Sequence, residues 1–214
     1  MKSTLPSVIE ALPLFPLPEV VFFPGTYLPL HVFEPRYQRL TEDALAGDKR
    51  LAVVLIEDNQ QHDNYGQPRL RPLATVGEIV HSDRLKGGRY NIVLQGLSRA
   101  RLVELPFEPP YRRARAELLC DATQAVAETA IGAMLFTATR FMGSITLSDS
   151  TPEFHYPRER AAGALADVCA DSLIIDALDR QRVLETLDVR QRVQLVTETL
   201  ALQEALLGPA VPLS

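Results

Sequence analysis

The chain has 214 residues, of which 46% are hydrophobic and 23% charged, a composition typical of a globular protein with a sizeable core. Its formal net charge of −5 argues against a general binder of nucleic-acid phosphates, because such proteins carry an excess of Lys and Arg. The sequence has no signal-peptide pattern and no apolar run near the roughly 20 residues that span a bilayer, so we expect no membrane contact and a cytoplasmic location.

The first predicted elements are a helix and a buried strand. The segment from Pro35 to Gly47 predicts a helix that places Tyr37 and Leu40 on one face, since Pro suits a first helical position. Leu51 to Ile56 is short and continuously apolar, which is typical of a strand covered on both faces. Gln60 to Arg71 is almost entirely polar and is expected to be a mobile surface loop.

A hairpin and one further strand follow along the chain. The two glycines within Lys86 to Arg89 predict a tight turn between strands from Val76 to Leu85 and from Tyr90 to Gln95. From Arg113 to Leu118, charged residues alternate with Ala and Leu, the pattern of a strand with one wet face. Several short strands separated by turns predict a small β-barrel over residues 1–118.

The second half of the chain, residues 119–214, is rich in Ala, Leu, Arg and Glu and predicts an α-helical bundle packed against the first half. Asp121 and Gln124 have the spacing of a capping box, so a first helix is expected from Asp121 through Met142. Residues 143–157 are expected to form a loop. The sequence therefore predicts an α+β protein made of two subdomains.

Three further helical segments are expected after this loop. The first two run from about Arg158 to Asp171 and from about Leu173 to Leu187. Asp188 predicts the N-cap of the last helix. The apolar residues of that helix recur at helical spacing: Val189, Val193, Val196 and Leu200.

Two cysteines, Cys120 and Cys169, lie in apolar surroundings. In a reducing compartment such residues are usually buried thiols, so we expect both to be reduced and part of the core. A disulfide or a redox role is the alternative.

Motifs of catalysis and cofactor binding are missing from the sequence. The lysines Lys2, Lys49 and Lys86 do not follow Gly in a phosphate-binding loop, and the four histidines do not form a His-Glu-x-x-His pair. No Gly-x-Ser-x-Gly elbow occurs. We therefore expect no catalytic residue, no metal and no cofactor.

Arginines gather in one stretch of the first half, at Arg99, Arg101, Arg112, Arg113 and Arg115. Arginines on a strand face can follow RNA phosphates, which makes RNA binding an alternative function. A solvated strand face is the simpler interpretation, because no aromatic residues alternate with these arginines to stack on bases.

One long segment is recognisable. Residues 12–37 read LPLFPLPEVVFFPGTYLPLHVFEPRY, and this segment resembles the opening signature of the Lon protease N-terminal substrate-binding domain family. The entry into the helix, FEPRY, is typical of short, stand-alone bacterial members. Val76 to Val80, Leu94 to Arg101 and Leu184 to Arg192 are similar to further segments of the family.

The resemblance implies a PUA-like pseudo-barrel with one inserted helix, followed by a helical bundle. In a full-length Lon protease an ATPase module and a Ser-Lys peptidase domain come after this region, and we expect this chain to lack both. It also implies a non-catalytic protein that binds unfolded or partly folded polypeptide, as an adaptor, a chaperone-like binder or a sensor. Alternatives are RNA binding and a scaffold for one folded partner.

Two surfaces are candidates for that binding. Near the signature, Tyr27 and Phe33 could line an apolar groove, with Arg36 and Arg39 on the adjacent helix meeting acidic groups or backbone oxygens. Both aromatic residues could equally belong to the core. The second candidate is the Met-containing stretch of the first long helix, because Met side chains adapt to varied partners. Its residues are Met134, Phe136, Phe141 and Met142, for which packing inside the bundle is the alternative.

Overall fold

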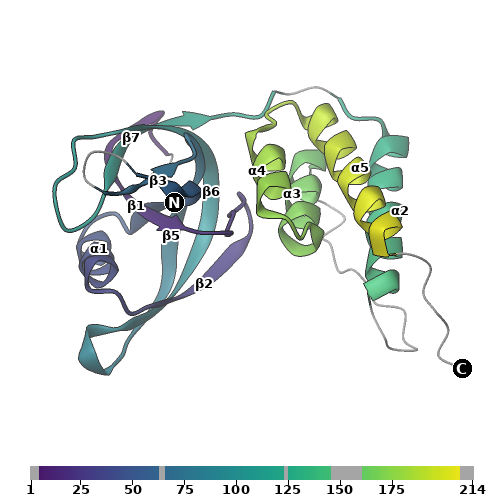
Figure 1. Ribbon diagram of the computed structural model, residues 1–214. Coiled ribbons are helices and arrows are strands. Elements are labelled where there is room, and N and C mark those ends of the chain that lie inside the picture. Colours follow the sequence, from purple (N-terminus) through teal and green to yellow (C-terminus); the bar gives the residue numbers. More distant parts are fainter. Residues whose placement is uncertain (1–4, 63–65, 123–124, 146–160, 208–214) are drawn as a thin grey trace, which may run out of the picture. The chain divides into compact units, whose positions relative to one another are not determined.

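The computed structural model describes residues 5–62, 66–122, 125–145 and 161–207. The chain divides into two compact units, Met1–Cys120 and Asp121–Ser214. The strands of the described residues and one α-helix belong to the first unit, and four helices belong to the second (Figure 1). The structure thus confirms the predicted α+β class, with a β-rich part that precedes a helical part.

Five strands of the first unit close into a barrel. The strands of this unit are β1 (Val8–Leu17), β2 (Tyr27–Val32), β3 (Arg50–His62), β4 (Pro68–Leu70), β5 (Leu73–Arg84), β6 (Tyr90–Glu104) and β7 (Arg113–Leu119). The sheet runs in the order β1-β7-β6-β5-β3, and parallel pairing of β3 with β1 closes the ring. Two strands lie outside the ring, because β2 pairs with β6 and β4 pairs with β3.

Small side chains fill the inside of the barrel. Alternate residues of the five closing strands form one buried cluster, in which alanines sit beside Leu and Val. A five-stranded ring encloses little space, which explains why alanine is frequent there. The cluster contains Leu12, Leu14, Ala52, Val54, Ala74, Val76, Ala100, Leu102, Ala114 and Ala116.

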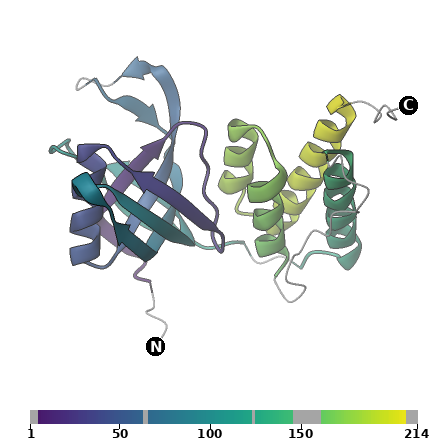
Figure 2. The same cartoon turned by 90° about the horizontal axis from the view of Figure 1, so that it is seen from below.

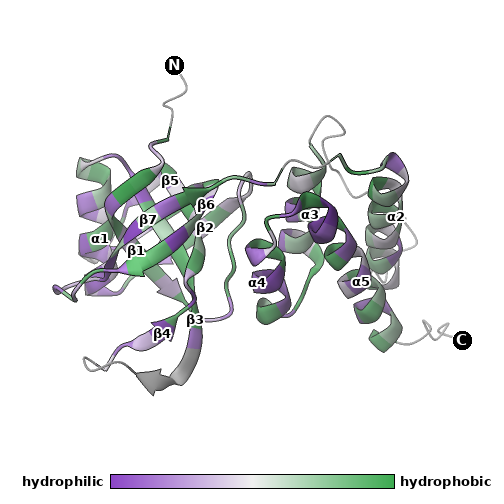
Figure 3. Ribbon diagram, turned by 90° about the horizontal axis from the view of Figure 1, so that it is seen from above, coloured by the Kyte–Doolittle hydropathy of each residue, from purple (hydrophilic) through white to green (hydrophobic). Residues whose placement is uncertain are grey.

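The outside of the barrel carries a second core beneath helix α1 (Pro35–Ala46). Tyr37, Leu40 and Ala44 of the helix are buried, and the Tyr37 ring stacks on the Phe15 ring with centroids 4.3 Å apart. In Figure 3 the helix alternates between hydrophobic and hydrophilic colours, as expected for a helix with one buried face. The predicted helix is confirmed, as is the buried strand, since Leu51 to Leu55 are covered on both faces.

The predicted hairpin is also confirmed. Strands β5 and β6 pair from Leu73↔Arg101 to Arg84↔Tyr90, and Gly87 and Gly88 in the turn have φ of 76° and 75°. These angles lie in the left-handed region that glycine adopts without steric cost. The alternation in β7 is confirmed too, with Ala114 and Ala116 buried and Arg115 exposed.

The predicted loop from Gln60 to Arg71 is wrong in part, because β3 continues to His62 and pairs with β4. These strands extend beyond the barrel (Figure 2). Backbone pairing holds them, and the Arg112 guanidinium donates a hydrogen bond of 2.6 Å to the Pro68 carbonyl oxygen. A strand held in this way needs few apolar side chains, which is why a polar stretch appeared to be a loop.

The described residues of the second unit form four helices: α2 (Glu128–Ile145), α3 (Ala162–Leu173), α4 (Ala177–Glu185) and α5 (Val189–Leu207). The predicted start of the first helix at Asp121 is wrong, because α2 begins at Glu128. Gln124 of the expected capping box lies outside the described residues, as does most of the expected loop 143–157. The two short helices exist, with bounds that differ by a few residues from the prediction.

Helix α5 packs one face into the core of its unit. Val193, Val196 and Leu200 are buried, and Val189 is nearly so. The Asp188 side chain accepts a hydrogen bond of 3.0 Å from the Gln191 backbone amide, which confirms the predicted cap.

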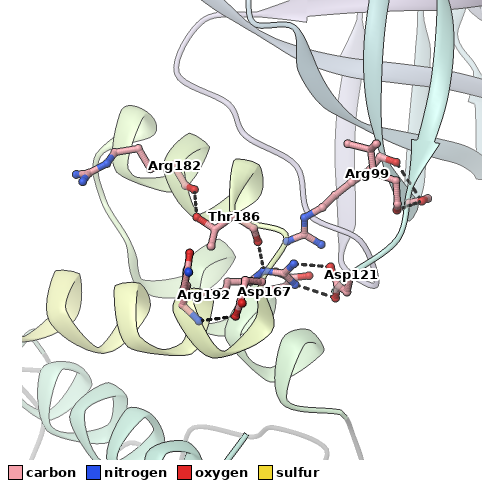
Figure 4. A network of polar contacts seen from close by, with 10 residues as sticks. Arg99, Asp121, Asp167, Arg182, Thr186 and Arg192 are labelled. Carbon is pink, nitrogen blue, oxygen red and sulfur yellow. Dashed lines mark hydrogen bonds and ion pairs between the residues drawn. The ribbon is translucent and has the colours of Figure 1, made fainter. Parts of the chain in front are cut away.

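An ion-pair network centred on the buried Arg192 ties α5 to two other segments of this unit (Figure 4). The Arg192 side chain is 0% exposed and contacts both carboxylate oxygens of Asp121, one through Nη1 at 3.0 Å and the other through Nη2. Its Nη1 also lies 3.4 Å from Oδ1 of Asp167 on α3, and its Nε donates to the Thr186 carbonyl oxygen at 2.8 Å. Asp121 therefore pairs with an arginine and does not cap a helix.

The two cysteines differ in exposure. Cys169 on α3 is buried, as predicted, and burial raises the pKa of its thiol to about 12. Cys120 follows the last residue of β7 and is exposed, so its prediction as a core residue is wrong.

We expect iodoacetamide at mildly alkaline pH to modify Cys120 in the folded protein and to leave Cys169 unmodified, because only thiolates react and Cys169 stays protonated. Mass spectrometry after proteolysis would locate the modified residue. Both cysteines should react once urea unfolds the chain. Equal labelling of the two thiols in the folded protein would contradict this expectation.

Candidate functional site

The edge strand β2 presents aromatic residues to solvent. Its residues alternate, with Leu28, Leu30 and Val32 turned toward the outer core. Tyr27 and His31 point the other way, and the aromatic row continues past the end of the strand at Phe33. The side chains of Tyr27 and Phe33 are 60% and 62% exposed. The structure therefore contradicts the alternative that places Tyr27 and Phe33 in the core.

We call Tyr27, His31 and Phe33 the β2 strip. The His31 and Phe33 rings stack with centroids 6.2 Å apart, and His31 Nδ1 lies 2.7 Å from the side-chain oxygen of Asn91 on β6. Tyr27 and Phe33 are six residues apart, a separation of about 20 Å along an extended chain. The strip can thus contact several residues of an extended partner.

The predicted arginines lie on the exposed side of α1. Arg36 forms an ion pair of 2.8 Å with Glu34, and its guanidinium lies 4.6 Å from the centroid of the Tyr37 ring. Arg39 pairs with Asp43 at 3.1 Å, and its side chain is 62% exposed. The structure brings Phe33 and Arg36 to the same strand-helix junction, whereas Tyr27 lies at the far end of β2 and Arg39 one helical turn further along α1.

The second predicted surface, on the first long helix, is wrong. Met134 and Phe141 are 0% and 1% exposed and belong to the core of the helical unit, as the packing alternative proposed. Met142 is half-buried. Phe136 is 64% exposed, but its neighbours at Met134 and Phe141 face the opposite way, so the four residues do not share a surface.

The arginine cluster of the first unit is largely neutralised by carboxylates. Arg99 and Arg112 are buried, contrary to the interpretation as a solvated face. The other three form ion pairs, Arg101 with Glu117, Arg113 with Glu108 and Arg115 with Glu10. A surface whose cations are paired in this way attracts nucleic-acid phosphates weakly.

The sequence did not predict two hollows that the described residues of the first unit form. The smaller has a volume of about 80 Å³ and connects Arg36 and Tyr37 of α1 with the segment after β6. Its lining residues are Pro16, Arg36, Tyr37, Gln67, Phe107, Pro110, Tyr111 and Arg112. The larger has a volume of about 500 Å³ and shares Phe107 and Arg112 with the first. The signal in the sequence was the pair Leu105 and Phe107, two apolar residues in a proline-rich segment without strand or helix pattern.

Two tyrosines beside the smaller hollow stay protonated at neutral pH. Burial raises the pKa of Tyr37 and of Tyr111 above the usual value for tyrosine. The Tyr111 hydroxyl donates a hydrogen bond of 2.7 Å to Oδ2 of Asp43, and the Arg113 guanidinium lies 5.0 Å from the Tyr111 ring centroid. These contacts fix α1 against the loop that precedes β7.

Within the described ranges, no three His, Cys, Asp or Glu side chains gather in a way that could hold a metal ion. The helices in those ranges also include none that is long and apolar enough to cross a membrane.

The chain is similar to proteins of one family. The sequence model of the ATP-dependent protease La (LON) substrate-binding domain matches residues 11–201. Lon protease 2 of Myxococcus xanthus is 34% identical over 204 residues, which cover 93% of this chain and 24% of that protein. Lon protease of Dictyoglomus thermophilum is 32% identical over 195 residues, which cover 88% and 24%. The chain thus spans about a quarter of the length of the curated relatives it matches.

Solved structures share the fold. The Lon N-terminal domain protein from Xanthomonas campestris superposes with a TM-score of 0.61 at 24% identity, covering 89% of this chain and 98% of that one. The N-terminal domain of Lon protease from the Mycobacterium avium complex gives a TM-score of 0.59 at 14% identity, with coverages of 90% and 98%. At such identities the likeness concerns the fold alone.

Proposed function

This chain belongs to the family of the Lon substrate-binding domain, and from that premise we propose that it holds unfolded or partly folded polypeptide without cutting it. The relatives are named as proteases, and this chain corresponds to about a quarter of each. The proposal assigns to this chain the recognition of the client, the role for which the matching family model is named. A cytoplasmic adaptor or chaperone-like binder would act in this way.

The exposure of Tyr27 and Phe33 is the observation that carries the proposal. Burial stabilises a protein by about 25 cal/mol for each Å² of apolar surface, so exposed aromatic side chains that lie in one row offer a surface that a partner can cover, whereas a single exposed one needs no explanation. Tyr27 begins β2 and Phe33 directly follows it, and the arginines of α1 begin three residues after Phe33. This combination of apolar rings and guanidinium groups suits a polypeptide with exposed core residues.

The double change Tyr27→Ser and Phe33→Ser is expected to weaken binding of a fluorescent, permanently unfolded protein by about tenfold or more, because it removes the apolar contacts of the β2 strip. Fluorescence anisotropy during titration measures the affinity. The thermal midpoint should stay close to that of the wild type, because both side chains are already exposed in the folded chain.

Phe136→Ser is the matched control, since Phe136 is 64% exposed but belongs to α2 of the other unit and not to the β2 strip. It should bind the unfolded protein as the wild type does. The proposal fails if the wild type shows no saturable binding, or if the control loses as much affinity as the double variant. Co-purification of RNA with a steep salt dependence would support the alternative function instead.

A further inference from the structure

The larger hollow of the first unit is a groove with two walls. Strand β4 forms one wall, and the segment that follows β6 forms the other. Its volume of about 500 Å³ lies within the range of ligand-binding clefts in proteins. We call it the β4 groove, and its lining residues are Arg69, Leu70, Glu104, Leu105, Pro106, Phe107 and Arg112.

Arg112 connects the two walls. Its Nε donates a hydrogen bond of 2.7 Å to Oε2 of Glu104, and Nη2 lies 2.5 Å from the same carboxylate. Its Nη1 donates to the carbonyl oxygen of Pro68, the first residue of β4. The Arg112 side chain is only 9% exposed, so it is fixed by its partners. A groove whose walls are joined in this way is open before a ligand arrives, which lowers the entropic cost of binding.

The groove combines three apolar side chains with paired charges. Leu105 is 38% exposed, and Leu70 and Phe107 are half-buried beside it. Arg112 pairs with Glu104, and Arg69 lies 3.7 Å from Glu57. The cations of the groove are thus balanced by carboxylates. Such a charge pattern fits a neutral ligand and gives a phosphate or a nucleic acid no net attraction.

Strand β4 also lies at the edge of the sheet. It ends the order of the sheet, and among the described strands it pairs with β3 alone. Backbone groups along such an edge can bond to an extended chain, while alternate side chains of that chain enter the pockets beside it.

We propose that the β4 groove binds an extended segment of polypeptide, with one large apolar side chain of that segment seated against Leu70, Leu105 and Phe107. This inference rests on the proposed function and adds a second contact, distinct from the β2 strip. An unfolded client is extended and exposes large apolar side chains, so the same molecule can reach both contacts.

The groove is tested by titration with a short fluorescein-labelled Gly-Ser peptide that carries one central Phe. The control peptide has Ser in place of that Phe. The wild type is expected to bind the Phe peptide more tightly. Leu105→Asp should weaken binding of the Phe peptide by about tenfold or more, because it places a charge where the ring would lie. Val103→Asp is the matched control, since Val103 is 59% exposed on β6 and outside the groove.

Selective loss of Phe-peptide binding in Leu105→Asp, with an unchanged thermal midpoint, supports the inference. The inference is overturned if Leu105→Asp and Val103→Asp bind the Phe peptide with equal affinity. It is also overturned if the wild type binds the Phe peptide and the Ser peptide equally. Titration of all three proteins with the permanently unfolded protein separates the two proposals. If the wild type binds the unfolded protein, but Leu105→Asp and Val103→Asp have the same affinity for the Phe peptide, only the proposal about the β4 groove is rejected. Absence of any binding of the unfolded protein by the wild type rejects the proposed function.

Discussion

Arg192→Met is expected to lower the free energy of unfolding by about 3–5 kcal/mol, because it removes the buried guanidinium that the buried carboxylate of Asp167 contacts. The side chains of Arg192 and Asp167 are 0% and 4% exposed, so water cannot replace the lost partner at Asp167. Asp121 also loses both of its contacts with the guanidinium. Urea denaturation followed by circular dichroism would give the change, provided that the slope of the transition stays the same.

Arg190→Met is the matched control for this experiment. Arg190 lies two residues before Arg192 on α5 and is exposed, so its replacement should change the free energy of unfolding by no more than about 0.5 kcal/mol. The triple variant Arg192→Met, Asp121→Asn, Asp167→Asn should recover part of the stability, because it also removes the two negative charges that Arg192 contacts. An Arg192→Met protein as stable as the Arg190→Met protein would show that the network contributes little.

Gly96→Ala is expected to destabilise the β-rich unit by about 3 kcal/mol or more. A Cβ at this position would lie 2.1 Å from the Phe23 carbonyl oxygen and 3.1 Å from the Cα atom of Pro24. Both obstacles are backbone, and hydrogen bonds of Gly96 to Gly25 and Thr26 hold the two segments together at 2.9 and 3.0 Å. The clash cannot be relieved by a side-chain rotation, so the turn before β2 must move.

Gly132→Ala on α2 is expected to stabilise the protein. A Cβ at Gly132 meets no atom within 4 Å, and Ala is a better helix former than Gly by about 0.8–1.0 kcal/mol. We therefore expect the thermal midpoint to rise for Gly132→Ala and to fall for Gly96→Ala. Identical thermal midpoints for Gly96→Ala and the wild type would mean that the backbone of residues 23–24 can move away from the added Cβ at little cost in free energy.

Local patterns predicted much of the fold. The alternation around Ala114 and Ala116, the glycine turn at Gly87 and the spacing of α5 each depend on residues close in sequence, and the structure confirms them. Asp121 could not be placed in this way, since its partner Arg192 lies 71 residues away in the sequence. Strand β4 was missed because backbone pairing, and not an apolar face, determines it.

The candidate site was harder to predict than the fold. In β2 and the residue after it, apolar residues occur on both faces, so the sequence could not tell whether Tyr27 or Leu28 points inward. The pairing of β2 with β6 decides this, and it places Tyr27 outside. Conversely, Met134 and Phe141 lie on a helix with apolar residues around most of its surface, and only packing against neighbouring helices shows that they are inside.

The ring of strands also sets an order of events during synthesis. Strand β1 is made first, yet it pairs on one side with β3 and on the other with β7, for example Val8 with Glu117. The ring cannot close before the ribosome has released nearly the whole unit, and until then the edge of β1 that pairs with β7 has no partner strand on the nascent chain. Under the proposed function, a binder of unfolded clients would therefore itself pass through a stage in which it resembles one.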